Sequence, residues 1–240
     1  MSGTKCLAEV IEVARLTHDV KEIAFKLLQP DRLSFQAGQY IAIEVTEMKD
    51  GRPRQNNRPY SIVSPPEETE VIRLCVNLVN GGPGSSYLHT LKVGDRVSFL
   101  HPFGYFVLKT AADAPILFVA TGTGIAPILS MVEHLIHSNR RQEMLLYWGL
   151  RSERDLYYQD LLAGLAEKDP LFRFETTLSQ PSPAWQGARG RVTEKIAKAF
   201  EPVENQEAYL CGSLAMIREV RAMLLEKGMP KRVIHFEKFY

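Results

Sequence analysis

Apolar and polar residues alternate along much of the first hundred residues, as in strands with one buried face. The runs are short and are broken by turn-forming sequences such as Gln29-Pro30-Asp31 and Val93-Gly94-Asp95. Strands are predicted at residues 8–16, 20–28, 40–45, 60–64, 71–79 and 96–100, with a turn at 49–53 and one short helix at 85–91. Many short strands at this spacing predict a small closed antiparallel barrel over residues 1–110.

The period of the pattern changes after Pro115. Residues 116–120 are continuously apolar, as in a parallel strand buried on both faces, and the next apolar residues recur with helical spacing up to Ile136. Further strands are predicted at 144–148, 172–178, 208–211 and 233–239, with helices at 156–166, 192–200 and 216–227 between them. Strands alternating with helices predict a doubly wound parallel sheet over residues 111–240, with the domain boundary in the stretch 109–114.

Composition and charge narrow the possible functions. With 45% hydrophobic and 24% charged residues in 240, the chain can form sizeable cores, and its net charge of +1 argues against a nucleic-acid partner. No apolar run approaches the roughly 18 residues of a membrane span. Glu9 and Glu12 interrupt any apolar signal region, so we predict a cytoplasmic protein. The cysteines Cys6, Cys75 and Cys211 are too far apart for a zinc or iron–sulfur cluster, so no metal site is predicted.

A glycine turn lies between the strand at 116–120 and the following helix. Thr121, Gly122, Thr123 and Gly124 let the backbone approach a pyrophosphate, and the helix start supplies free N–H groups. The third glycine of the common dinucleotide fingerprint is replaced by Pro127, and the second strand lacks a carboxylate at its end. The turn therefore predicts a nucleotide site that differs from the common dehydrogenase type.

Six segments in this order resemble the ferredoxin–NADP reductase superfamily, over roughly residues 5–240. They are Arg58-Pro59-Tyr60-Ser61, residues 82–88, 102–106 and 122–127, Cys211-Gly212, and the terminal Tyr240. The resemblance implies an antiparallel Greek-key barrel that binds FAD, followed by a nicotinamide-nucleotide domain. It also implies a stand-alone FAD-dependent NAD(P)H oxidoreductase that passes hydride from nicotinamide to flavin. The electrons would go on to a separate ferredoxin, flavodoxin or oxygenase component.

The resemblance also implies which residues hold the flavin. In the segment Arg58–Pro59–Tyr60–Ser61, the arginine would form a fork to the FAD pyrophosphate and the tyrosine would lie flat on the isoalloxazine. The Ser61 hydroxyl would bond the flavin nitrogen that accepts hydride. At the start of the short helix, pyrophosphate donors are expected at Gly82, Gly84, Ser85 and Ser86.

The nicotinamide side is expected at the carboxyl ends of the parallel strands. Cys211 and Gly212 would lie beside the nicotinamide and flavin rings, with an ordinary buried cysteine as the alternative reading of Cys211. Glu237 is a candidate proton or charge partner. Either Phe239 or Tyr240 would stack on the flavin.

The choice of coenzyme depends on cations near a 2′-phosphate. The sequence Ser179-Gln180-Pro181 lacks the arginine that often follows such a serine in NADPH-using relatives, which favours NADH. Arg189 and Arg191 are candidates for a phosphate contact from the same loop, and Arg151 and Arg154, after the second strand, could contribute as well.

The expected partner is a small iron–sulfur or flavin carrier, since the chain has no cysteine set for a cluster of its own. Scattered basic residues could steer an acidic partner, namely Arg52, Arg54, Lys227, Lys231, Arg232 and Lys238. A monomer or weak oligomer is expected. Two alternatives stay open: an NAD(P)H:flavin reductase that releases reduced flavin, and an electron-transfer subunit of a larger complex. The segment 82–88 argues for retained FAD.

Overall fold

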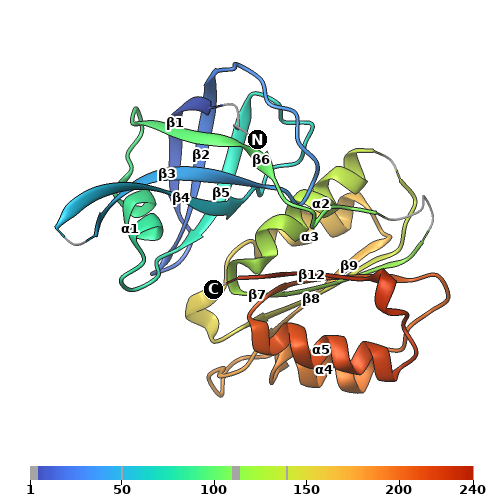
Figure 1. Ribbon diagram of the computed structural model, residues 1–240. Helices are drawn as coiled ribbons and strands as arrows, with labels where there is room; N and C mark the ends of the chain where they lie inside the picture. Colours follow the sequence, from blue (N-terminus) through green and yellow to red (C-terminus); the bar gives the residue numbers. More distant parts are fainter. Residues whose placement is uncertain (1–4, 50, 110–113, 139, 240) are drawn as a thin grey trace.

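The computed structural model describes residues 5–49, 51–109, 114–138 and 140–239. They form two six-stranded sheets, one in each half of the chain (Figure 1). The first sheet contains β1 (Lys5–Arg15), β2 (Val20–Gln29), β3 (Tyr40–Lys49), β4 (Arg52–Ser61), β5 (Val71–Asn77) and β6 (Arg96–Phe103). The short helix α1 (Pro83–Thr90) connects the last two strands.

The first sheet is an antiparallel barrel with a Greek-key crossing. Its order is β4-β3-β6-β1-β2-β5, so the last strand lies between the first and the third. A bridge between Ile62 and Leu74 brings the two ends of the sheet together. Fully buried side chains such as Phe25, Ile43 and Phe99 fill the interior, as the alternating pattern requires.

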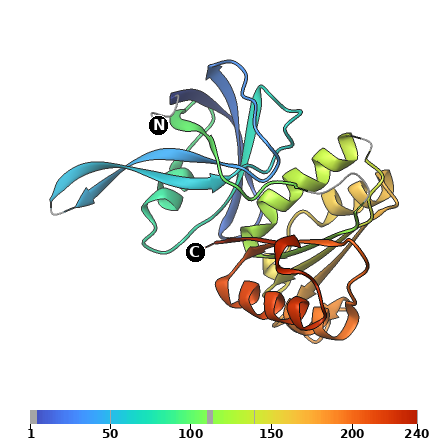
Figure 2. The same ribbon diagram turned by 45° about the vertical axis from the view of Figure 1, so that its right-hand side comes forward.

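The hairpin of β3 and β4 departs from the predicted elements. A turn was expected at 49–53 and a strand at 60–64, but β4 begins at Arg52 and ends at Ser61. Figure 2 shows that this hairpin projects beyond the barrel. Both faces of its outer part meet solvent, so Arg52, Arg54 and Gln55 lack the apolar alternation that identifies a strand.

The second sheet is parallel and doubly wound. Its strands are β7 (Ile116–Thr121), β8 (Met144–Leu150), β9 (Phe172–Leu178), β10 (Ala188–Arg189), β11 (Glu207–Gly212) and β12 (Ile234–Lys238), in the order β10-β9-β8-β7-β11-β12. The helices are α2 (Ile125–His137), α3 (Gln159–Lys168), α4 (Val192–Ala199) and α5 (Leu214–Glu226). Three short 3₁₀ helices are η1 (Gly122–Gly124), η2 (Glu153–Asp155) and η3 (Lys231–Val233).

This arrangement confirms the predicted fold class. Helices α2 and α3 cover the face of the parallel sheet nearer the barrel, and α4 and α5 cover the other face (Figure 1). The direction of winding reverses between β7 and β11, which are neighbours in the sheet. Ligands of such sheets bind at this switch point, beyond the carboxyl ends of the strands. The predicted boundary between residues 110 and 111 falls outside the described residues and stays a prediction.

Helix α2 packs directly against the barrel. Barrel residues Val63, Cys75 and Phe106 belong to the same apolar cluster as the buried face of α2. The Ser130 hydroxyl of α2 donates to the carbonyl of Ser64 at 2.8 Å. Among the residues described, no helix is both long and apolar enough to cross a membrane.

A buried carboxyl group makes this packing sensitive to pH. Glu133 on α2 is 7% exposed and lies 3.7 Å from Arg73 of β5. Burial raises the pKa of Glu133 to about 7, and the Arg73 charge only partly opposes this effect.

We expect the unfolding free energy to fall as pH rises from about 4.5 through about 7, since the folded state binds this proton more tightly. Glu133 would account for up to about 3 kcal/mol of the decline, at about 1.4 kcal/mol per pKa unit. Denaturant unfolding at several pH values tests this, and Glu133→Gln should make the decline shallower than in the wild type. Glu143→Gln, an exposed change on the same domain, serves as control, and equal profiles for the two variants would contradict the assignment.

Candidate functional site

The glycine turn after β7 is held against the end of β11. An added Cβ at Gly124 would lie 2.4 Å from the carbonyl oxygen of Cys211. At Gly212, where φ is +140°, an added Cβ would lie 2.2 Å from Oγ1 of Thr121. These glycines are required because two backbone segments approach closely at the switch point.

The buried side chain of Trp148 also holds the glycine turn in place. The indole Nε1 of Trp148 donates to the carbonyl of Gly122 at 3.0 Å. The Thr121 hydroxyl accepts from the N–H of Ser213 at 3.0 Å, which joins the turn to the start of α5. The backbone of the turn is therefore positioned by both of its neighbouring strands.

A cavity of about 780 Å³ lies between the barrel and this turn, and we call it the barrel cavity. It is lined by the predicted segment Arg58–Ser61, by the start of α1, and by the end of β12. Its lining residues on the expected list are Arg58, Pro59, Tyr60, Ser61, Gly82, Gly84, Ser85, Thr121, Gly122, Thr123, Gly212, Glu237 and Phe239. The structure thus gathers segments that are far apart in the chain.

Strand β4 and helix α1 form a tight corner of the barrel cavity. An added Cβ at Gly84 would lie 2.6 Å from the Tyr60 hydroxyl and 2.9 Å from Cγ of Arg58. The absence of a side chain at Gly84 lets the first turn of α1 sit beside both residues. The Ser85 hydroxyl is bonded locally, since it accepts from the N–H of Val79 at 3.1 Å.

Arg58 has a fixed orientation on β4. Its Nε donates to Oε1 of Glu47 on β3 at 2.7 Å, and Asn56 donates to Oε2 of Glu47 at 2.9 Å. The Arg58 side chain is still 42% exposed, whereas that of Glu47 is 16% exposed. Part of the guanidinium therefore remains accessible from the cavity that it lines.

Ser61 and Glu237 meet across the cavity although they lie far apart in the chain. The Ser61 hydroxyl donates to Oε2 of Glu237 at 3.5 Å. Burial raises the pKa of Glu237 to about 7, and the hydrogen bond from Ser61 opposes this rise. A carboxyl group that titrates near neutral pH beside a hydroxyl is well suited to controlling a proton.

Cys211 lies behind this pair on β11, opposite Glu237 in the register of β11 and β12. It is fully buried and is not among the residues that line the cavity, and burial raises its pKa well above the usual value. Phe239 follows β12, lines the cavity, and donates its N–H to the carbonyl of Gly212 at 2.8 Å. Tyr240, the other candidate for a stacking ring, lies outside the described residues.

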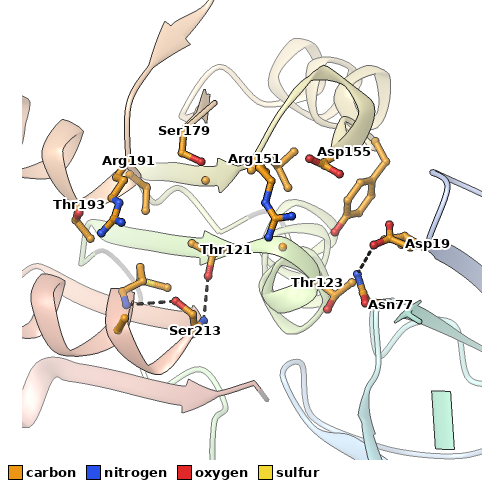
Figure 3. Close-up of a pocket in the computed structure, with 18 of the residues that line it drawn as sticks. Asp19, Asn77, Thr121, Thr123, Arg151, Asp155, Ser179, Arg191, Thr193 and Ser213 are labelled. Carbon is orange, nitrogen blue, oxygen red and sulfur yellow. Dashed lines mark hydrogen bonds between the residues drawn. The ribbon is translucent and has the colours of Figure 1, made fainter. Parts of the chain in front are cut away.

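A second cavity of about 560 Å³ opens beyond the carboxyl ends of the parallel strands, and we call it the strand-end cavity. Figure 3 shows Ser179 at the end of β9, with Arg191 on one side and Arg151 on the other. The two cavities share five lining residues, Asn77, Thr121, Gly122, Thr123 and Ser213. They therefore adjoin one another at the glycine turn.

Besides Cys211, three expected contact residues line neither cavity. Gly124 is buried within the turn, and Ser86 is exposed in the first turn of α1. The guanidinium of Arg189 donates instead to the carbonyls of Pro183 and Trp185, within its own loop. Arg191, two residues further on, is the arginine of this loop that lines the strand-end cavity.

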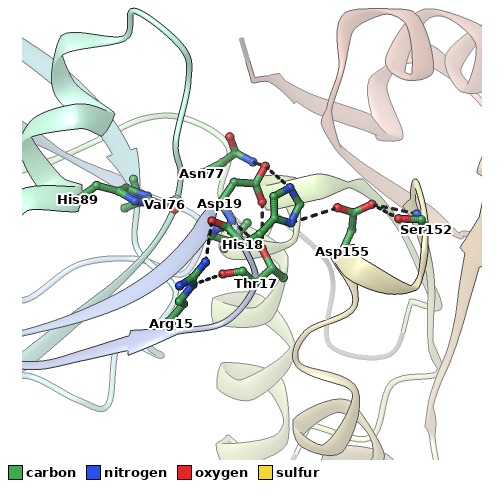
Figure 4. Close-up of polar contacts among 10 residues, drawn as sticks. Arg15, Thr17, His18, Asp19, Val76, Asn77, His89, Ser152 and Asp155 are labelled. Carbon is green, nitrogen blue, oxygen red and sulfur yellow. Dashed lines mark hydrogen bonds and ion pairs between the residues drawn. The ribbon is translucent and has the colours of Figure 1, made fainter.

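Several lining residues gave no sequence signal. Tyr40, Cys75 and Asn77 reach the barrel cavity because of strand register alone. The loop between β1 and β2 supplies Asp19, which accepts from Thr17 at 2.9 Å and from Asn77 at 3.3 Å (Figure 4). No local pattern at these positions distinguishes them from other strand and loop residues.

Both halves of the fold match family models of oxidoreductase domains, which defines the chain as a two-domain oxidoreductase. The family model for an oxidoreductase FAD-binding domain matches residues 7–108, and that for an oxidoreductase NAD-binding domain matches residues 118–222. The first match covers the barrel and the second covers most of the parallel-sheet domain.

Similar proteins point to the same class along the whole chain. Ferredoxin–NADP reductase B of Sorangium cellulosum is 32% identical over 97% of this chain and 96% of its own length. The phenol hydroxylase P5 protein of Acinetobacter pittii is 32% identical over 97% of this chain and 65% of its own length. The crystal structure of the Amycolatopsis cytochrome P450 reductase GcoB is 31% identical, with a TM-score of 0.84 over 98% of this chain and 70% of its own length.

The chain belongs to the ferredoxin–NADP reductase superfamily. It is an FAD-dependent NAD(P)H oxidoreductase, as expected from the order of its motifs. It spans about two thirds of the length of the phenol hydroxylase component and nearly all of the ferredoxin–NADP reductase.

Proposed function

We propose that the barrel cavity holds FAD, that the strand-end cavity holds NAD(P)H, and that the two rings meet at the glycine turn. The observation that carries this proposal is the sharing of five lining residues by the two cavities. Two reactants held side by side react as if at very high concentration, which supplies much of the rate of such a transfer. Bound FAD would supply hydride acceptance from nicotinamide and release of electrons to a carrier.

The residues of the barrel cavity fit the parts of FAD. Arg58 and the start of α1 offer a cation and N–H donors for the pyrophosphate, and Gly84 keeps that corner free of a side chain. Tyr60 provides a ring face for the isoalloxazine. On this proposal the Ser61 hydroxyl donates to the flavin when Glu237 is protonated and does not accept its hydrogen bond.

We further propose that the acceptor is a separate small iron–sulfur or flavin carrier protein. Support comes from the relatives, which include a ferredoxin–NADP reductase and a phenol hydroxylase component. The first of these has almost the same length as this chain.

The test begins with the absorbance of the purified protein. We expect a yellow protein with one FAD per chain that NADH or NADPH bleaches in a stopped-flow instrument. Reoxidation by a plant-type ferredoxin, a flavodoxin and free flavin then ranks the acceptors. A colourless protein that reduces added flavin would make it a flavin reductase instead. A yellow protein that neither coenzyme bleaches would make it an electron-transfer subunit.

The coenzyme preference is open to a specific prediction. Arg151, Ser179 and Arg191 line the strand-end cavity, so we propose that they bind a 2′-phosphate and that NADPH is used as well as NADH. A charge-assisted hydrogen bond contributes about 1.5–3 kcal/mol, or at least roughly tenfold in an equilibrium.

Arg191→Ala is accordingly expected to lower kcat/KM for NADPH about tenfold relative to NADH. Steady-state kinetics with both coenzymes measure the ratio. Arg189→Ala is the matched control, since Arg189 lies in the same loop, lines neither cavity, and donates its guanidinium N–H to carbonyls of that loop. The assignment fails if the ratio falls for Arg189→Ala and not for Arg191→Ala.

A further inference from the structure

Two adjacent tyrosines of the nucleotide domain reach the barrel. Tyr157 and Tyr158 lie between η2 and α3, and Tyr158 has φ of 55°, a left-handed conformation that bulky side chains rarely adopt. The Tyr158 hydroxyl donates to Oε2 of Glu22 on β2 of the barrel. A backbone conformation of this kind persists only where surrounding contacts hold it.

On the barrel side, this contact adjoins the wall of the barrel cavity. Glu22 stands opposite Cys75 in the register of β2 and β5, and Cys75 lines the barrel cavity while being only 6% exposed. Burial raises the pKa of Cys75 to about 12, and the neighbouring Tyr158 hydroxyl acts in the opposite direction. The Tyr158 hydroxyl therefore lies against both the Glu22 carboxylate and the Cys75 thiol.

On the nucleotide side, the contact leads to the glycine turn. The ring of Tyr157 lies 5.0 Å from that of Tyr158 and packs edge-on against Trp148, with centroids 4.8 Å apart. Trp148 is fully buried and is the residue whose indole N–H holds the carbonyl of Gly122. A continuous series of packed side chains thus joins the turn to the barrel wall.

We infer that the hydrogen bond between Tyr158 and Glu22 is a positioning latch, which sets the distance between the glycine turn and the wall of the barrel cavity. This inference rests on the proposed function, because the latch would fix how closely nicotinamide approaches the flavin. Neither residue lines a cavity, so both are positioning residues. A misplacement of about 1 Å costs roughly 100-fold in the rate of such a reaction.

A second bridge between the same parts of the molecule is weaker. His18 of the barrel lies 4.0 Å from Asp155 of η2, beside the strand-end cavity (Figure 4). The two side chains are 44% and 24% exposed, so solvent screens their interaction. Of these two bridges, the partly buried contact of Tyr158 is therefore the less screened, and helix α2 holds the barrel separately through Ser130.

The first experiment measures flavin reduction in the holoenzyme at saturating coenzyme. Tyr158→Phe and Glu22→Ala should each lower the rate constant about tenfold, with coenzyme Kd and FAD content unchanged. The double variant should be no slower than either single one, because both changes remove the same interaction. Glu22→Gln keeps an acceptor oxygen and should restore most of the rate, and Tyr147→Phe, a buried change on β8, should have no effect.

The second experiment follows alkylation of Cys75 by peptide mass spectrometry and needs no turnover. Opening of the latch should speed Cys75 labelling about tenfold in Tyr158→Phe and Glu22→Ala. Cys6, buried in the barrel core, is the internal control and should label at the wild-type rate.

Wild-type labelling of Cys75 in both variants would overturn the latch, and so would additive losses of rate in the double variant. Equal acceleration at Cys6 and Cys75 would also overturn it, because that result reports general unfolding. Labelling is independent of flavin reduction, so a protein that fails to oxidise NAD(P)H would overturn the proposed function while the latch is still tested.

Discussion

Replacing Gly124 by alanine is expected to lower the rate of flavin reduction by NAD(P)H at least 100-fold while FAD stays bound. The added Cβ would lie 2.4 Å from the carbonyl oxygen and 2.6 Å from the carbonyl carbon of Cys211. Both atoms belong to the backbone of a central strand, so the glycine turn must move instead. A shift of about 1 Å in a turn that orients the coenzyme costs roughly 100-fold in rate.

Stopped-flow reduction, together with the flavin-to-protein absorbance ratio, measures both parts of this prediction. Gly164→Ala is the matched control, because nothing lies within 4 Å of a Cβ added at that position in α3. It should leave the rate unchanged and stabilise the helix by about 0.5–1 kcal/mol. A wild-type rate for Gly124→Ala would show that the turn does not position the coenzyme.

Ser61→Ala is expected to slow flavin reduction 10- to 100-fold. Removing one well-placed hydrogen-bond donor at a reacting centre costs about 10²–10³ in rate where that donor stabilises a full charge, and the expected loss here lies at or below the lower end of that range. FAD should stay bound, because its pyrophosphate contacts would be made elsewhere, at Arg58 and α1. Ser138→Ala, at the end of α2, is the control. Loss of FAD combined with a normal rate in reconstituted protein would refute the role of Ser61.

The pH profile gives an independent check on the same pair. Ionised Glu237 accepts a hydrogen bond from the Ser61 hydroxyl, whereas protonated Glu237 leaves that hydroxyl free to donate into the cavity. Since the pKa of Glu237 is raised to about 7, flavin reduction should fall as pH rises through about 7. Glu237→Gln should remove this inflection, and an unaltered profile in that variant would exclude Glu237 as the titrating group.

Much of the fold follows from short-range pattern. The strand at 116–120 and its glycine turn were predicted correctly because buried parallel strands and helix starts have local signatures. The outer part of the β3–β4 hairpin was missed because Arg52 and Arg54 project into solvent from a strand with no buried face. Side-chain alternation cannot identify a strand that has nothing to bury.

The candidate site was predictable to a similar extent. Arg58–Ser61, the start of α1 and the glycine turn are motifs, and the structure brings them around adjoining cavities. The choice between Arg189 and Arg191 was not predictable, since it depends on how β10 pairs with β9. The contact between Cys75 and Tyr158 could not be predicted either, because it forms only when the two domains pack together.

Local patterns in the chain were enough to predict the two-domain fold, the family and most of the segments that line the two cavities. Each of these depends on residues close together in sequence, whose sterics and hydrogen bonding act over a few positions. Three features came from the tertiary structure alone. They are the contact of Ser61 with Glu237, the residues shared by the two cavities, and the Tyr158–Glu22 latch. Burial and strand register bring those partners together, and both depend on residues that are distant in the sequence.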